Sequence, residues 1–398
     1  MRFLLLILIP ALSFAQTEPA ADAPESEAEA EEAPAAPPPP LWPEELGPLP
    51  VQAAPHPLPG LSAQVCNACH GAVHDQWAGS GHATASSDPV WQQARTALGD
   101  PPLCNECHLP LQAQRTEVPR GPGGSRSEAN PAWDPGLATE GVTCVACHLR
   151  GDAIVGPREL PAGQAPHKVR YEPALSTAEA CAFCHQAALP GAEETPFLDT
   201  VGEWRASPFG AAGVPCQDCH MPRTSGAIAG SRFAAFGAHG TSRTEAALGR
   251  AITLNLDVNA PRLQRGQTLR ATATVQNTGA GHAVPTGDPS HRLEVRFELL
   301  DGEDNPVPGV EAESVWLGRE MAAEAPFAEV SDTRLQPGAE RTFDFVAPLS
   351  KKATPGRWTL VVSVRWWPAS PERLTELGLG ESVGPRVMTE RRIPVRVE

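Results

Sequence analysis

The sequence is poor in the residues that usually fill a protein core. Its 398 residues include one tyrosine, 11 phenylalanines and nine tryptophans, so aromatic residues make up only 5% of the chain, against 44 prolines and 35 glycines. Such a chain has little material for one large core of side chains, so part of it is disordered or something other than protein fills the interior. The length alone allows two or three domains.

Basic residues are also scarce. The chain has 31 Lys and Arg residues against 47 Asp and Glu residues, which gives a formal net charge of −16. A protein that neutralises phosphates needs the opposite balance, so we expect no nucleic-acid partner.

Long hydrophobic runs are absent except at the N-terminus. Arg2 precedes an apolar run that starts at Phe3, and small residues lie at Ser13 and Ala15. The run is roughly 12 residues long, whereas a membrane-spanning helix needs about 20. We therefore expect residues 1–15 to be a cleaved signal peptide and the protein to be exported to the periplasm or beyond it, to the cell-surface side.

Residues 16–59 consist largely of Ala, Glu and Pro and include the four-proline run Pro37–Pro40. Up to Pro59 the chain carries nine acidic residues and one basic residue, Arg2, which is a net charge of −8. A segment of this composition buries too little apolar surface to offset its chain entropy, so the sequence predicts a disordered, acidic spacer.

Cysteine, by contrast, is abundant and strictly patterned. The ten cysteines form five Cys-x-x-Cys pairs, and a histidine follows each pair directly; the five motifs are Cys66/Cys69/His70, Cys104/Cys107/His108, Cys144/Cys147/His148, Cys181/Cys184/His185 and Cys216/Cys219/His220. The chain has only 12 histidines in all, so five such coincidences do not arise by chance. This pattern is the attachment signature of c-type haem.

Haem attachment explains the spacing chemically. Two thiols two residues apart form thioethers with the vinyl groups of one porphyrin, and the adjacent histidine becomes the proximal ligand of the iron. Disulfides would fit an exported protein but leave the histidines unexplained. Structural zinc combines two pairs per site, which five pairs do not allow, and redox-active dithiols usually occur singly. We therefore expect five covalently attached haem c groups.

The motifs follow one another at nearly equal distances. Their first cysteines lie 38, 40, 37 and 35 residues apart, which indicates a tandem array rather than five separate domains. Fewer than forty residues cannot enclose each macrocycle alone, so the haems pack against one another and electrons hop between them.

Several stretches resemble the multihaem c-type cytochromes related to the tetrahaem cytochrome that accepts electrons from hydroxylamine oxidoreductase. The similar stretches lie within Leu61–Leu300 and are Cys66–Ala83, Gly141–His148, Trp204–Pro222, Gly237–His239 and Gly279–Gly287. The resemblance implies a mainly helical and irregular multihaem domain over residues 60–250.

Seven histidines remain as candidates for the distal iron positions. The resemblance implies His82, His239 and His282 as distal ligands, and His167 lies where the family often has one. His74 is a further candidate, although it follows its own attachment motif so closely that it would have to reach a neighbouring iron. His56 in the spacer and His291 at the head of an expected strand are interpreted as ordinary histidines. The segment that ends at Phe236 lacks a histidine often seen there, so one iron is left without an assigned sixth ligand.

The last third of the chain has a different pattern. Hydrophobic and polar residues alternate with period two, and turn residues separate the runs, which predicts strands with one buried face. We expect about seven strands, at 252–258, 269–275, 293–299, 314–319, 342–347, 358–366 and 391–397. Together they predict an all-β, immunoglobulin-like sandwich over residues 251–398.

Three functional hypotheses follow from the sequence. The first is an exported pentahaem cytochrome that transfers electrons between redox proteins as donor and acceptor. The second is a reductase or oxidase that acts on a small nitrogen or sulfur compound at one five-coordinate haem; no catalytic side chain is assigned. In the third, the sandwich docks the cytochrome to a membrane or surface complex. The sequence does not indicate the oligomeric state.

Overall fold

A computed structural model describes residues 42, 49, 54–120, 126–161, 163–189, 192, 194–240, 245–324 and 327–398. Residues Pro40–Glu398 form one compact unit. The predicted signal peptide at residues 1–15 lies outside the described residues, as does most of the predicted spacer at 16–59.

The end of the predicted spacer corrects one expectation. Trp42 stacks on Phe183 with ring centroids 4.9 Å apart, and the guanidinium of Arg150 lies 4.6 Å from the Trp42 ring centroid. Leu49 is 3% exposed, donates its backbone N–H to Pro110 O at 2.7 Å and accepts from Gln112 N at 2.8 Å. The prediction of a disordered segment is therefore wrong for these two residues, because each finds an apolar contact that outweighs the Ala/Pro-rich composition around it.

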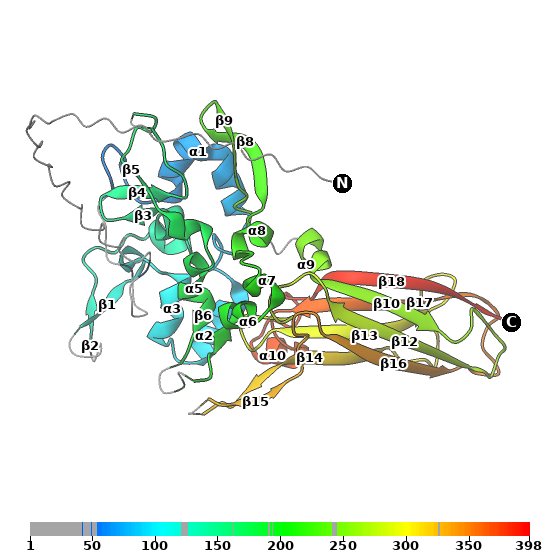
Figure 1. The fold of residues 1–398 in the computed structure, drawn as a ribbon. Coiled ribbons are helices and arrows are strands. Elements are labelled where there is room, and N and C mark those ends of the chain that lie inside the picture. Colours follow the sequence, from blue (N-terminus) through cyan, green and yellow to red (C-terminus); the bar gives the residue numbers. More distant parts are fainter. Residues whose placement is uncertain are drawn as a thin grey trace, which may run out of the picture. The chain divides into compact units, whose positions relative to one another are not determined.

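Residues 54–251 contain short helices and small β-hairpins (Figure 1). The α-helices are α1 (Ala63–Ala78), α2 (Pro89–Ala97), α3 (Pro102–His108), α4 (Cys144–His148), α5 (Glu179–His185), α6 (Thr200–Arg205), α7 (Pro208–Ala211), α8 (Cys216–His220) and α9 (Glu245–Ala251). Polar caps begin several of them: Ser62 accepts from Gln64 N at the start of α1, and Asp88 accepts from Trp91 N at the start of α2.

The strands of this part pair locally, which the sequence did not predict. They are β1 (Glu117–Arg120) with β2 (Arg126–Ala129), β3 (Leu149–Arg150) with β4 (Ala153–Gly156) and β5 (Val169–Tyr171), β6 (Gln186–Ala187) with β7 (Leu198–Asp199), and β8 (Arg223–Ala229) with β9 (Arg232–Gly237). The apolar cluster here is small. Its fully buried members are Leu49, Leu111, Val145, Ala146 and Leu149.

From Ile252 onward the chain forms two sheets (Figure 1). The three-stranded sheet has the order β10 (Ile252–Val258), β12 (Thr268–Asn277), β16 (Glu340–Pro348). The six-stranded sheet has the order β11 (Arg262–Leu263), β18 (Arg386–Val397), β17 (Gly356–Trp367), β13 (Arg292–Leu300), β14 (Glu313–Met321), β15 (Glu329–Asp332). The seven expected strands are confirmed, while the short strands β11 and β15 were not predicted.

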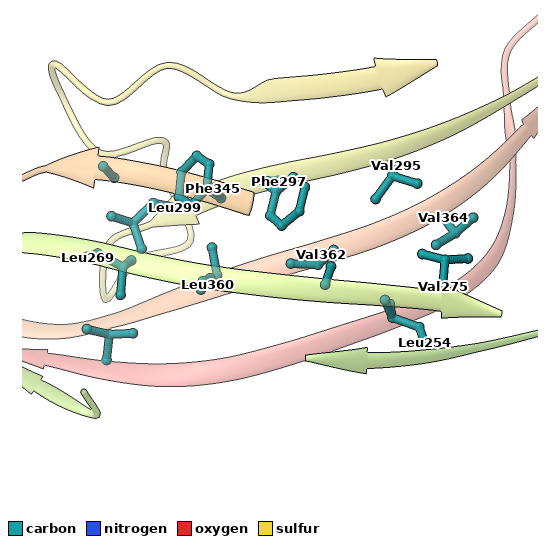
Figure 2. Close-up of a cluster of buried hydrophobic side chains, with 14 of the residues drawn as sticks. Leu254, Leu269, Val275, Val295, Phe297, Leu299, Phe345, Leu360, Val362 and Val364 are labelled. Carbon is teal, nitrogen blue, oxygen red and sulfur yellow. The ribbon is translucent and has the colours of Figure 1, made fainter. Parts of the chain in front are cut away.

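The alternation along these strands produces one hydrophobic core. In β12 every second residue from Leu269 to Val275 is buried, as the period-two pattern requires. Figure 2 shows these side chains meeting those of β13, β16 and β17, including Phe297 and Phe345, whose rings stack with centroids 5.3 Å apart.

Two segments of the β region contact the helical part. The loop between β12 and β13 hydrogen-bonds to α6 through Ala283 N and Thr286 Oγ1, both of which donate to Glu203. The segment around α10 (Pro371–Glu376) contributes its buried Leu374 to a cluster against which Val90 and Ala94 of α2 pack. Within the described residues, no helix is both long and apolar enough to cross a membrane.

Candidate functional site

Each Cys-x-x-Cys-His motif lies on a helical turn. Helices α3, α4, α5 and α8 all end at the motif histidine, and α1 departs from helical geometry at His70, with φ −105° and ψ 39°. Residues i, i+3 and i+4 share one face of a helix. The turn therefore presents both thiols and the imidazole of a motif on the same side, where a single flat ligand can meet all three.

The ten cysteines form no disulfide bonds in the structure. All ten are free thiols. They lie close to thiols of other motifs: Cys66 shares a hydrogen bond with Cys144, Cys107 with Cys184, and Cys181 with Cys216. The hydrogen bond from Cys144 lowers the pKa of Cys66, and the one from Cys181 lowers the pKa of Cys216 to about 7. Motifs far apart in the chain are thus brought together.

Two of the predicted haem-attachment thiols, Cys69 and Cys219, differ from the other eight. Both are exposed, whereas the others are partly buried. Cys69 and Cys219 belong to the first and the fifth motif, at the two ends of the tandem array. All ten cysteines remain predictions as haem anchors.

Three motif histidines face histidines from other parts of the chain. The ring centroids are 6.3 Å apart for His82 and His185, 6.1 Å for His148 and His239, and 6.0 Å for His220 and His282. Two imidazoles bound on opposite sides of one metal, each through a metal–nitrogen bond of about 2 Å, have ring centroids roughly 6 Å apart. The three distal ligands that the resemblance implies, His82, His239 and His282, each lie at this separation from a motif histidine.

The imidazoles are oriented by backbone carbonyls. The distance from Nδ1 to a carbonyl oxygen is 2.6 Å for His70 and Ile228, 2.7 Å for His108 and Ala85, and 2.9 Å for His148 and Val155. The same contact is 2.8 Å between His239 and Gly237, and 2.9 Å between His282 and Ala283. A carbonyl can only accept, so Nδ1 carries the proton and Nε2 is left to bind a metal, which is the usual support of a ligating histidine.

Burial keeps these imidazoles in the neutral, metal-binding form. Desolvation lowers the pKa of His220 to about 4, with a further contribution from the nearby His282. Desolvation and then the proximity of His148 lower the pKa of His239 to about 4. Burial also lowers the pKa values of His148 and His282. At neutral pH these side chains are therefore uncharged.

An ion pair that the sequence did not suggest holds the loop of His282. Glu203 of α6 accepts from Arg334 Nη1 at 2.5 Å, from Thr286 Oγ1 at 2.6 Å and from Ala283 N at 3.1 Å. Both charged side chains are 5% exposed. Arg334 is also bound by Asp332, at 2.8–2.9 Å, and hydrogen bonds to both carboxylates help to raise its pKa against the effect of burial. No sequence motif marks these residues, because they meet only in the folded chain.

The other two predicted ligands, His74 and His167, are not paired with a motif histidine in this way among the described contacts. His74 is 8% exposed and its Nε2 lies 3.1 Å from Gln64 Nε2, while its Nδ1 has no hydrogen-bond partner among the described residues. The Nδ1 of His167 is likewise buried without a partner in the described part of the chain. His56 is exposed. His74 and His167 therefore remain predictions.

The donor set fits haem c. Each helical turn offers two thiols and a neutral imidazole on one side, and three of the five imidazoles have a second imidazole at the separation that an iron between them requires. Beside His108, Ser86 Oγ and Trp91 Nε1 are buried without hydrogen-bond partners in the described residues, as expected where a polar group of a bound cofactor completes the site.

The fold is similar to that of a solved multihaem protein. No family model and no curated protein matches the chain. The penta-haem cytochrome c552 of Thermochromatium tepidum shares 22% identity with it over 84% of this chain and 98% of that chain, with a TM-score of 0.63. The CARDB domain of the PF1109 protein of Pyrococcus furiosus aligns with 37% of this chain and 87% of its own, at 13% identity and a TM-score of 0.21. The comparison with the cytochrome shows that this chain has a multihaem cytochrome fold.

Proposed function

We propose that this protein is an exported pentahaem c-type cytochrome that transfers electrons between redox proteins. The observation that carries the proposal is the set of three histidine pairs at 6.0–6.3 Å, each joining a Cys-x-x-Cys-His motif to a remote histidine. Structural zinc or redox-active dithiols would not require the remote histidines. When bound, the haem irons supply reversible one-electron chemistry.

The protein's own residues set the properties of each iron. The motif cysteines hold the macrocycle, and the carbonyl acceptors at Nδ1 fix the direction of each imidazole. Two histidine ligands favour a low-spin iron whose geometry changes little between oxidation states. Such a site conducts electrons and leaves no position for a substrate, so the pairs at His148, His185 and His220 favour electron transfer.

The contacts between thiols suggest the order of the haems. Cys66 meets Cys144, which places the first and third motifs side by side, and Cys107 meets Cys184, which joins the second and fourth. Cys181 meets Cys216, which joins the fourth and fifth. We infer that the first haem lies beside the third, and that the fourth haem contacts the second and the fifth.

The β region supports the haem-binding part. Its strand order, β10-β12-β16 in one sheet and β11-β18-β17-β13-β14 in the other, agrees with the order of an immunoglobulin-like sandwich, which we propose for residues 251–398. Its β12–β13 loop delivers His282 to His220. We therefore infer that the β region completes the fifth haem site, in addition to any role in docking to a membrane or surface complex.

The test is to produce the full-length chain in a host that attaches c-type haem and to measure its mass and its electron paramagnetic resonance spectrum. We expect a mass increase of five haems, predominantly low-spin signals and removal of residues 1–15. Cys144→Ala combined with Cys147→Ala should lower the haem count by one. A protein without covalent haem contradicts the proposal. A haem that stays high-spin and binds nitrite would favour the small-molecule reductase instead.

A further inference from the structure

The β12–β13 loop carries a second histidine with the features of a ligand. His291 was interpreted from the sequence as an ordinary residue at the head of a strand. In the structure it is half-buried, and its Nδ1 lies 2.8 Å from Thr286 O. This contact is the one made by His148, His239 and His282, and it directs Nε2 away from the loop backbone. His74 and His167 lack this contact.

The surroundings of His291 connect it to the second motif. The His291 ring meets the Trp366 ring edge at a centroid distance of 5.0 Å, and the adjacent Ser290 donates to Pro368 O at 2.9 Å. The chain that follows Pro368 packs, through Ala369 and Leu374, against α2. Helix α2 in turn carries Trp91, which stacks on the ring of His108 with centroids 4.6 Å apart and planes at 9°.

One of the charges that act on Cys104 of the second motif comes from the same loop. Burial raises the pKa of Cys104, the charge of Arg95 lowers it, and the charge of Asp288 raises it. Asp288 belongs to the turn of His291, because its carbonyl oxygen accepts from His291 N at 3.0 Å. This interaction agrees with the contacts that connect the turn to α2. Arg95 also contacts this motif directly, through Asn105 Oδ1 at 3.4 Å.

We propose that His291 is the distal iron ligand of the haem attached at Cys104, Cys107 and His108. This inference rests on the proposed function. One loop of the β region then serves two irons, with His282 opposite His220 and His291 opposite His108. The motif histidines His148, His185 and His220 already face other imidazoles, so the second motif is the site near this turn that gains a ligand from it.

The experiment compares the full-length haem-loaded protein with the variant His291→Ala. We expect the variant to keep five haems by mass and to gain one high-spin haem per chain in its electron paramagnetic resonance spectrum. The reduced variant should bind one more carbon monoxide per chain than the wild type. Added imidazole should return the new high-spin haem to the low-spin state, which a merely structural change would not allow. His56→Ala, at an exposed histidine outside the motifs, is the control and should change neither signal.

A second variant assigns the affected haem. In a chain that carries Cys104→Ala and Cys107→Ala, and hence four haems, His291→Ala should add no high-spin signal. An unchanged spin count in His291→Ala, a new high-spin haem that imidazole does not rescue, or a signal that persists without the second motif overturns the inference. Fewer than five haems in the wild type would instead count against the proposed function, so the two failures are distinguishable.

Discussion

At the scale of single residues, the site depends on imidazole rings that are neutral and oriented with Nε2 towards the iron position. Desolvation lowers the pKa values of His148, His220, His239 and His282, so each is uncharged at neutral pH. Carbonyl oxygens accept from Nδ1 and so decide which nitrogen can bind iron. These carbonyls belong to the backbone, so substitutions affect ligation mainly by moving the backbone that carries them.

Gly141 illustrates this dependence. It adopts φ +59°, and a Cβ there would lie 2.5 Å from His82 O and 3.0 Å from Ala83 O. We expect Gly141→Ala to displace the segment of His82 and to turn the haem at His185 high-spin. Gly151→Ala is the matched control: φ is +62° but nothing lies within 4 Å. It should cost only the backbone strain, about 1 kcal/mol, and leave every spin state unchanged.

Spectra and urea unfolding of both variants check this prediction. Equal spectra for Gly141→Ala and Gly151→Ala would show that the close approach to His82 does not support the ligand.

At this scale, the sequence could predict the residues that a local motif marks. The spacing within each motif identified the ten cysteines and five proximal histidines as candidates, and the resemblance identified His82, His239 and His282, which the structure pairs with motif histidines. The spacing could not show which motif thiols are covered by other motifs and which, like Cys69 and Cys219, are exposed. Glu203, Arg334 and Trp91 could not be found from local pattern either, because their contacts join residues more than ten positions apart, and no spacing in the chain encodes them.

At the scale of elements, two segments bring histidines to motifs that lie on other elements. The β8–β9 hairpin contacts the first motif, since Gly230 N donates to Cys69 O and Ile228 O lies 2.6 Å from His70 Nδ1. His239 follows the hairpin directly and faces His148. The β12–β13 loop does the same for His282. The hairpin was not predicted because its strands pair through the backbone and lack a regular hydrophobic alternation.

The loop of His282 provides an element-scale prediction. Glu203→Ala removes the acceptor of Arg334, Thr286 and Ala283, and leaves a buried guanidinium with only Asp332. We expect a loss of about 3 kcal/mol in the free energy of unfolding, as is typical when one partner of a buried pair is removed. Because the loop is then free to move, the haem at His220 should become at least partly high-spin.

The control for this change is Glu179→Ala. Its partner Arg205 lies at 2.7 Å, but the two side chains are 62% and 52% exposed, so the loss should stay below about 1 kcal/mol. Denaturant unfolding and electron paramagnetic resonance distinguish the two variants. A fully low-spin spectrum in Glu203→Ala would mean that the ion pair stabilises the fold without positioning His282.

At the scale of the whole molecule, the buried apolar residues are unevenly distributed between the two parts of the chain. The β region has a continuous core that includes Phe297, Phe345 and Trp358, whereas the fully buried apolar cluster of the helical part has five small or aliphatic members. Five macrocycles would supply the missing apolar volume. The strands were predictable because a protein core imposes alternation on them; the helical part was not predictable in detail because its interior is shaped for a ligand.

Charge is the second property of the whole molecule that the proposed haems would alter. Residues 60–250 contain 18 acidic and 13 basic residues, and the propionates of bound haems would add further negative charge to this part. An acidic surface steers cationic partners towards it and raises their association rate. We therefore expect rapid electron exchange with a basic redox protein, and the second-order rate constant should fall at least tenfold between about 0.01 M and 0.15 M salt, as the Debye length shrinks from about 30 Å to about 8 Å.

Stopped-flow reduction of the oxidised protein by a basic c-type cytochrome, used as a probe of charge, measures this rate. An uncharged small reductant is the control, since its rate should hardly change with salt. An acidic redox protein should show the opposite trend and react faster as salt screens the repulsion. A rate with the basic probe that is flat or rises with salt would mean that the docking surface is not the acidic one, and that the positive charges of the β region, such as Arg391 and Arg392 on β18, direct the encounter instead.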